Sequence, residues 1–293
     1  MYKASIDKIR LKLKLRENKI LDKGKTPYIY DALVAKYDVP EYIEYLDEPI
    51  ESLARYRYRW SVSLRIVDEK EGTLWLGMGY NENLTDERKL CVEFNPNKSG
   101  VRIFEWLRFT FNLEITSIVN CDVAFDVPNV DVADVTLNTT ADVMTYGTVK
   151  NKTLYIAPKG ENRIKVYQKN IERENVGVDM AKTLRIEISL KGEWLSYNNT
   201  ANADTDKIMA CINRLNSVSW IDNVNSTDVT LYLLLNSPTD VKQTALSLMS
   251  SATRAKYRKM LQAQSNTLNL DYLTFCDLMH ILLKPYLRGI KIK

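Results

Sequence analysis

Alternating apolar and polar residues dominate the first 200 positions of the chain. Such alternation predicts β-strands, because successive side chains of a strand point to opposite faces of a sheet. The predicted strands are Ile6–Leu15, Tyr58–Ile66, Thr73–Gly77, Leu90–Phe94, Ser117–Val127, Thr153–Ile156, Ile164–Tyr167 and Leu184–Leu190. Between them, Val101–Phe111 has helical spacing, with apolar residues at positions 103, 104, 107 and 111. We expect a mainly antiparallel sheet with flanking helices.

After residue 200 the spacing becomes helical. The predicted helices are Asp204–Leu215, Asp228–Leu235, Thr239–Gln264 and Leu270–Leu283. The run Ser237-Pro238-Thr239-Asp240 is a helix start signal, with a capping serine and a proline in the first turn. The Asn-rich tract 197–203 is typical of a domain boundary. The predicted fold class is therefore α+β, with a sheet domain over residues 1–200 and an all-helical domain over residues 201–293.

Charge is unevenly distributed. The 293 residues include 41 Lys and Arg against 37 Asp and Glu, a formal net charge of +4. Residues 1–26 carry nine basic residues against three acids, and residues 254–293 carry eight against two. The two ends are therefore where a polyanion would most readily bind.

Histidine and cysteine usage excludes several chemistries. The single histidine, His280, leaves no His-His metal pair and no zincin helix, and we expect it to be packed or capping. The four cysteines have no Cys-x-x-Cys spacing, which favours reduced, buried thiols. The chain begins without the apolar core of a signal peptide, and its longest apolar run, Leu231–Leu235, is too short to span a membrane. We expect a cytoplasmic protein with no membrane partner.

Three predicted strands combine an apolar face with a polar one. The polar faces carry Asn120, Asp122, Ala124 and Asp126; Arg163, Lys165, Tyr167 and Lys169; and Arg185, Glu187, Ser189 and Lys191. One interpretation is a solvated outer face without function. The other is a platform on which carboxylates hold a divalent metal and cations bind phosphates. Asp122 and Asp126 are about 13 Å apart along a strand at ~3.3 Å per residue, so a shared ion would pair Asp122 with Glu187 instead.

These segments resemble plasmid rolling-circle replication initiators of the trans-acting Rep type, which are related to relaxases of conjugative elements. Residues 118–126 resemble the family's Ile-Thr-Arg-Ile-Asp-x-Ala-x-Asp strand, with Asn120 and Cys121 in place of Arg and Ile. Residues 163–169 resemble its Arg-hydrophobic-Tyr-Asp-Lys strand, with Gln168 replacing the acid. Residues 184–197 resemble the stretch from an Arg-x-Glu strand to the nucleophilic tyrosine, and residues 91–98 resemble an Asn-Pro-x-Lys turn of related initiators.

The resemblance implies a Rep-type, HUH-like palm without the histidine pair, and a nicking and joining reaction on DNA. It implies a catalytic group of Tyr197, Arg185 and Lys191, and a metal site of Asp122, Glu187 and Asp126. It implies DNA contacts from Lys165, Tyr167 and Lys169. Oxygen ligands favour Mg²⁺ or Mn²⁺. Tyr167 and Tyr155 are the next candidates for the nucleophile, and Arg185 with Glu187 is alternatively a structural ion pair.

The C-terminal helices allow two interpretations. The segment Asp228–Leu235 and the following basic helix are compatible with a helix-turn-helix-like unit that contacts duplex DNA through Arg254, Lys256, Arg258 and Lys259. An ordinary helical bundle with a solvated basic face is equally compatible. Our leading hypothesis is a plasmid replication initiator that nicks and rejoins origin DNA through a 5′-phosphotyrosine, with a homodimer and a host helicase as candidate further partners. The rival hypotheses are a non-enzymatic DNA-binding protein on the same scaffold and a structural or interaction protein.

Overall fold

The computed structural model describes most of the predicted elements. The described residues are 2–15, 29, 32, 36, 43–45, 58–66, 72–80, 89–98, 100–147, 152–158, 162–174, 182–191, 205–220, 228–237, 239–263 and 266–287. They form two compact units, which we treat separately. Unit 1 comprises the described residues within Met1–Ser5, Val123–Ser189 and Asp204–Ile281. Unit 2 comprises those within Ile6–Asp122, Leu190–Ala203 and Leu282–Lys293.

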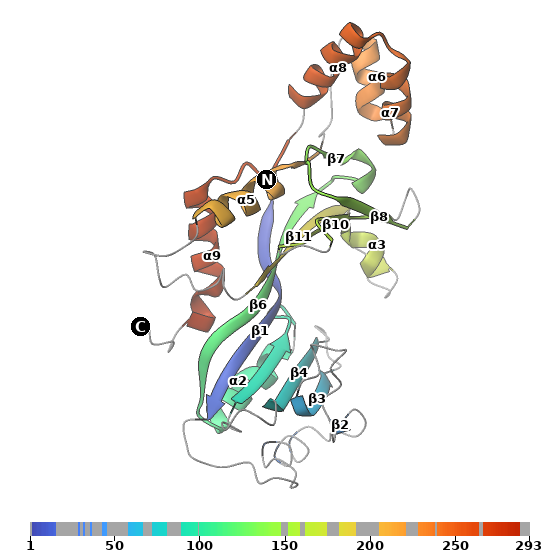
Figure 1. Ribbon diagram of the computed structural model, residues 1–293. Helices are drawn as coiled ribbons and strands as arrows, with labels where there is room; N and C mark the ends of the chain where they lie inside the picture. The colour runs from blue at the N-terminus through green and yellow to red at the C-terminus, as the bar shows by residue number, and fades with distance from the viewer. Residues whose placement is uncertain are drawn as a thin grey trace. The chain divides into compact units, whose positions relative to one another are not determined.

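The described part of unit 2 is an antiparallel sheet with helix α2 (Gly100–Thr110) packed against it (Figure 1). Its strands are β1 (Lys3–Leu15), β2 (Ile43–Tyr45), β3 (Tyr58–Ile66), β4 (Gly72–Tyr80), β5 (Lys89–Phe94) and the first part of β6 (Leu113–Pro128). Their order is β2-β3-β4-β5-β1-β6, and the pairs from β2 to β1 are antiparallel. The alternation in β1 explains its place inside the sheet, because Ile9, Leu11 and Leu13 are fully buried.

Helix α2 (Gly100–Thr110) covers part of this sheet. Its buried residues Ile103, Phe104 and Leu107 recur at helical spacing, and the Phe104 ring stacks on Phe94 of β5 with centroids 4.7 Å apart. Gly100 begins the helix where no side chain fits, because a Cβ atom there would lie 2.5 Å from the carbonyl oxygen of Thr73. The predicted helix at 101–111 is confirmed.

Unit 1 contains a second stretch of antiparallel sheet. Its strands are the last part of β6, β8 (Val143–Tyr146), β9 (Thr153–Ile156), β10 (Ile164–Gln168) and β11 (Thr183–Lys191), in the order β6-β11-β10-β9-β8. The short helix α3 (Lys169–Glu174) follows β10 directly. A 3-10 turn η1 (Val132–Asp134) precedes the small pair β7 (Thr136–Leu137) and β12 (Val218–Ser219). One face of the sheet is core, with Ile164, Val166, Ile186 and Ile188 fully buried as predicted.

The helices after residue 200 are α5 (Thr205–Asn216), α6 (Val229–Asn236), α7 (Thr239–Leu248), α8 (Ser251–Ala263) and α9 (Tyr272–Leu287). Helices α6, α7 and α8 pack side by side (Figure 1). No helix among the described residues is long and apolar enough to cross a membrane. The predicted domain boundary near residue 200 lies within residues 192–204, which are outside the described residues, so it stays a prediction.

The single predicted helix 239–264 is wrong, because the chain breaks it at Met249 and Ser250 into α7 and α8. The Ser250 hydroxyl accepts a hydrogen bond from the backbone N–H of Thr253, as an N-cap does. The Arg254 guanidinium donates to the carbonyl oxygens of Leu246, Ser247 and Met249 at 2.8, 2.8 and 3.0 Å. These bonds satisfy carbonyl groups that the end of α7 leaves without helical partners.

The α+β fold class is confirmed, with antiparallel sheet, flanking helices and a helical C-terminal region. The expectation of free thiols is also confirmed, since all four cysteines are free and Cys91, Cys121 and Cys211 are buried. His280, by contrast, is exposed on α9 and is not packed.

Candidate functional site

The polar residues of β10 and β11 face the same side of the unit 1 sheet. The register pairs Lys165 with Glu187 and Tyr167 with Arg185 across the two strands. Because these positions alternate with the buried isoleucines and valines, their side chains leave the sheet on the opposite face. We call this set, together with Asp126 on the neighbouring β6, the polar face. It gathers two cations, two acids and a tyrosine, as the alternation predicted.

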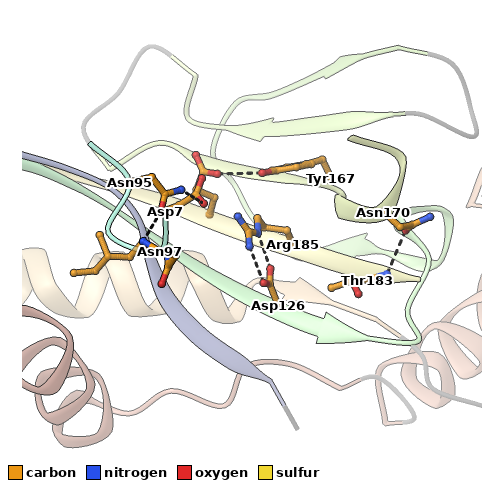
Figure 2. Close-up of polar contacts among 10 residues, drawn as sticks. Asp7, Asn95, Asn97, Asp126, Tyr167, Asn170, Thr183 and Arg185 are labelled. Carbon is orange, nitrogen blue, oxygen red and sulfur yellow. Dashed lines mark hydrogen bonds and ion pairs between the residues drawn. The ribbon is translucent and has the colours of Figure 1, made fainter. Parts of the chain in front are cut away.

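Arg185 and Asp126 form a two-point ion pair at the centre of the polar face. The guanidinium donates from Nε to Oδ1 at 2.6 Å and from Nη2 to Oδ2 at 2.7 Å (Figure 2). The Arg185 side chain is 7% exposed and that of Asp126 19%. A planar guanidinium fits a carboxylate in this paired geometry, which fixes its orientation as well as its charge. Asp126 is thereby engaged by a cation of the protein itself, a different role from the predicted metal ligand.

Tyr167 lies between two lysines and an acid. The Nζ atoms of Lys165 and Lys169 are 4.0 and 5.8 Å from its ring centroid, within the range of cation–π contact. Its hydroxyl donates to Oε2 of Glu187 at 3.4 Å. The tyrosine and Lys169 are buried, at 6% and 5% exposure, so this part of the face is enclosed and not simply solvated. Lys165, Tyr167 and Lys169, predicted to contact DNA, therefore lie together.

Gln168, which replaces an acid of the family pattern, ties β10 to the turn before η1. The backbone N–H of Val132 donates to Oε1 of Gln168 at 2.8 Å, and the Gln168 amide donates to the carbonyl of Val130 at 3.2 Å. The amide also donates to Oδ1 of Asn170. The same Oδ1 accepts from the Thr183 backbone N–H (Figure 2). A carboxylate has no proton to donate, so an acid at 168 could not make the bonds to Val130 and Asn170.

A second group of charges lies in unit 2, around Asp122. Its Oδ2 is 3.7 Å from Nζ of Lys8, and the same ammonium is 4.0 Å from Oε1 of Glu93. Glu93 in turn accepts from Nε of Arg10 at 2.8 Å, and the Arg10 guanidinium lies 5.7 Å from the centre of the Trp75 ring. Sequence reasoning did not propose Glu93 as a site residue. Its position in β5, between buried apolar residues, was the signal that could have found it.

The turn after β5 is held to β1. Asn95 donates from Nδ2 to Oδ1 of Asp7 at 3.2 Å and accepts from the backbone N–H of Asn97 at 2.8 Å (Figure 2). The Asn97 amide donates to the carbonyl of Ile6. These bonds give the Asn-Pro-Asn-Lys turn a structural role in anchoring β5 to β1.

The predicted metal ligands differ in how well they suit a cation. Asp122 is buried, at 7% exposure, and its Oδ1 has no hydrogen-bond partner among the described residues. A buried carboxylate oxygen with spare acceptor capacity suits Mg²⁺ or Mn²⁺. Asp126 suits a metal less well, because both its oxygens accept from Arg185. No group of three or more His, Cys, Asp or Glu side chains able to hold a metal occurs within the described residues.

The remaining predicted residues are placed as follows. Tyr197 lies outside the described residues, and the side chain of Lys191, at the end of β11, is likewise not described. Lys256, Arg258 and Lys259 are exposed on α8, whereas Arg254 is engaged with the end of α7. Asp122 belongs to unit 2 and Glu187 to unit 1, so their pairing stays a prediction.

Cys121, next to Asp122 on β6, has a fully buried thiol. Burial, reinforced by the negative charge of Asp122, raises the pKa of its thiol far above the ordinary value. The reactive form of cysteine is the thiolate, so a raised pKa makes the side chain inert.

Comparison with known proteins supports the resemblance inferred from the strands. No family model matches the chain. A replication initiation protein from Staphylococcus aureus is 28% identical over 213 residues, which is 68% of this chain and 60% of that protein. The chain thus spans about 60% of the length of this curated relative. Its resemblance to replication initiation proteins is confirmed.

A solved structure was also compared with the chain. The rolling circle replication initiator protein from Geobacillus stearothermophilus aligns with 18% identity and a TM-score of 0.37, over 78% of this chain and 90% of that chain. A similarity this low carries no argument about fold or activity.

Proposed function

We propose that this protein initiates rolling-circle replication by nicking and rejoining origin DNA. The observation that carries the proposal is the similarity to the Staphylococcus aureus replication initiation protein. The polar face supports it, because cations and acids lie there on one side of a sheet beside Tyr167, an alternative candidate for the nucleophile. Phosphoryl transfer to a tyrosine needs help in removing the phenol proton and cations that offset charge on the phosphoryl oxygens.

In the proposed reaction the Tyr197 hydroxyl oxygen attacks the phosphorus of the scissile phosphodiester. The bond between phosphorus and the 3′ oxygen breaks, a 5′-phosphotyrosine forms, and the 3′ oxygen takes up a proton to become the 3′-OH that primes synthesis. The phenol loses its proton to a base or to solvent. A phenol with a pKa near 10 needs such help, since it is mostly protonated at neutral pH.

The chain's charged side chains have distinct tasks in this proposal. Arg185 and Lys191 offset charge on the phosphoryl oxygens, while the half-buried Lys165 binds a flanking phosphate. Lys169 was predicted to contact DNA, but it is buried beside Tyr167, so we propose that it adds positive charge to the site without direct contact. Asp122 and Glu187 would hold Mg²⁺ or Mn²⁺, which supplies a positive charge to the phosphoryl oxygens when bound. We assign Asp126 a positioning role, because it holds the Arg185 guanidinium in one orientation.

The test is an incubation of the full chain with supercoiled plasmid carrying the origin and Mn²⁺. We expect nicked plasmid with protein joined covalently to the 5′ end, and loss of both in Tyr197→Phe. Tyr167→Phe and Tyr155→Phe examine the two alternative nucleophiles, and Tyr272→Phe on α9 is the matched control. A covalent adduct that persists in Tyr197→Phe but disappears in Tyr167→Phe or Tyr155→Phe would move the nucleophile to that residue.

The exposed face of α8 favours a second, compatible function in binding duplex DNA. Lys256, Arg258 and Lys259 are exposed there, and α8 is held against α6 by hydrogen bonds from the Tyr257 hydroxyl to Asp228 at 3.3 and 3.4 Å. Exposed lysines and arginines on a fixed helix are suited to phosphate contacts. If the chain binds origin duplex with a steep salt dependence yet never nicks it, the non-enzymatic hypothesis is the correct one.

A further inference from the structure

A second set of aromatic and basic residues continues the polar face toward the edge of the unit 1 sheet. The register places Lys165 of β10 opposite Tyr155 of β9, and Tyr155 opposite Met144 of β8. Tyr146, two residues beyond Met144, lies on the same face of β8. Arg163 immediately precedes β10, and its guanidinium lies over the ring of Tyr155. We call Tyr146, Tyr155, Arg163 and Lys165 the edge platform.

The side chains of the edge platform contact one another. The rings of Tyr146 and Tyr155 meet edge to face, with centroids 5.4 Å apart and planes at 89°. The Arg163 guanidinium carbon is 5.6 Å from the centre of the Tyr155 ring. The Tyr146 hydroxyl lies 4.0 Å from the Met144 sulfur. The two tyrosines are therefore held in defined positions on neighbouring strands.

The outer part of the edge platform is open to solvent, whereas Tyr155 and Lys165 are half-buried. Tyr146 is 53% exposed and Met144 38% exposed, and the remaining residues of β8 are exposed as well. In the part of the chain that the structure describes, β8 ends the strand order of this sheet. The accessible tyrosine ring therefore offers a flat π surface at the sheet edge, beside an exposed arginine.

Single-stranded nucleic acid fits this arrangement. Unpaired bases stack on tyrosine rings and on arginine guanidinium planes, while the adjoining cations bind the backbone. Bases in a duplex are stacked on each other and cannot reach the rings. Lys165 belongs both to the edge platform and to the polar face, so these two surfaces are continuous. Among the described residues, Asp142, exposed immediately before β8, and Glu187 of β11 are acids that limit its positive charge.

We propose that the edge platform binds the single-stranded DNA that flanks the nick site, with bases stacked on Tyr146 and on the Tyr155–Arg163 pair. This inference rests on the proposed function for the identity of the strand. The binding itself requires no cleavage, so it can be measured separately.

The experiment measures fluorescence anisotropy of a labelled oligothymidylate of about 16 nucleotides, the upper end of common site sizes, with the full chain. The same length of labelled duplex is measured in parallel. We expect Tyr146→Leu and Tyr155→Leu each to weaken single-strand binding about 5- to 150-fold, the range observed for the loss of one stacked base. Tyr146→Phe retains the ring and should bind within about two-fold of the unchanged protein.

Controls separate stacking from general effects. Phe109 is 91% exposed on α2 in unit 2, so Phe109→Leu removes an aromatic ring elsewhere that is more accessible than Tyr146. Arg163→Gln should weaken binding and make its dependence on salt less steep, by about 0.7 in the log–log slope for one lost phosphate contact. Circular dichroism and urea titration verify that each variant is folded.

Three results would overturn the inference: single-strand binding unchanged in both Tyr146→Leu and Tyr155→Leu, equal loss in Phe109→Leu, or equal loss of duplex binding. Failure of the proposed function looks different. If the chain never nicks plasmid but the tyrosine variants bind single strands more weakly, the proposed function is wrong and the edge-platform inference stands. If the tyrosine variants nick plasmid and bind single strands as the unchanged protein does, the edge-platform inference is wrong and the proposed function stands.

Discussion

The ion pair between Arg185 and Asp126 gives the sharpest prediction about how the polar face is built. We expect Arg185→Met to lower the free energy of unfolding substantially, because it leaves the Asp126 carboxylate without its two charge-assisted hydrogen bonds. Bonds to charged groups contribute about 1.5–3 kcal/mol each, so two of them amount to about 3–6 kcal/mol. Breaking one partner of a buried pair costs about 3–5 kcal/mol by an independent measure. Asp126 is partly solvated, at 19% side-chain exposure, which favours the lower end, about 3 kcal/mol.

The assay is urea unfolding followed by circular dichroism for Arg185→Met, Asp126→Leu and the double variant. Since removing both charges leaves no buried ion without a partner, the double variant should lose less than the sum of the singles, with a coupling of about 2 kcal/mol. Arg185→Lys keeps the charge but not the paired geometry and should fall between Arg185→Met and the unchanged protein. Arg258→Met on α8 is the exposed control and should change stability by less than about 0.5 kcal/mol.

The reasoning is refuted if each single variant costs less than about 0.5 kcal/mol, or if the two costs add within that margin. Either result would mean that the pair contributes neither stability nor orientation. A metal role for Asp126 would show up differently: Asp126→Leu would weaken Mn²⁺ binding more than Arg185→Met does, at equal stability.

Three further predictions follow from other described residues. Arg254→Gln should lower stability by about 1.5–3 kcal/mol in urea because it frees the carbonyls at the end of α7, whereas exposed Lys256→Gln should leave stability unchanged and weaken duplex DNA binding. Gln168→Glu should destabilise the chain by about 1–3 kcal/mol at neutral pH, since the carboxylate cannot donate to Val130, and restored stability on acidification would be the diagnostic sign. Burial lowers the pKa of Lys242 below its ordinary 10.5. Between the lowered pKa and 10.5 the unfolded chain binds more protons than the folded chain, so the free energy of unfolding should rise with pH. Lys242→Met should remove this slope and stabilise the chain by about 1–3 kcal/mol in thermal unfolding at neutral pH, because it removes a buried ammonium without a hydrogen-bond partner among the described residues. An unchanged pH slope in that variant would contradict the assignment.

The alternation of residues predicted the strands and their core faces because burial in a sheet depends on local position. Ile164 and Val166 are fully buried, and so are Ile186 and Ile188, as their spacing requires. Strand β8 was missed because all four of its residues are exposed, so no hydrophobic pattern marks it. The break between α7 and α8 was missed because Arg254 fixes it through contacts with residues up to eight positions away.

Pairing within the candidate site depended on strand order, which the sequence does not encode locally. The sequence analysis left open a structural ion pair between Arg185 and Glu187 across strands, as an alternative to their catalytic and metal roles. In the structure Arg185 pairs with Asp126, because β6 and β11 are neighbouring strands. Glu187 instead accepts a hydrogen bond from the Tyr167 hydroxyl. The types of residue on the polar face were thus predictable from the sequence, whereas their partners were set by topology.

This distinction bears on why two cations, Arg185 on the polar face and Lys169 at the start of α3, are buried. A buried ion pair is a weak source of net stability, because desolvation offsets most of the attraction. Arg185, Tyr167 and Lys169 nevertheless lie enclosed beside one another, each with defined partners. Fixed charges in an enclosed site stabilise developing charge more effectively than mobile ones, since they need no reorganisation during the reaction. Under the proposed function, this burial positions the charges for phosphate chemistry, whereas otherwise it serves only the local structure. The double-variant cycle together with the nicking assay separates the two explanations.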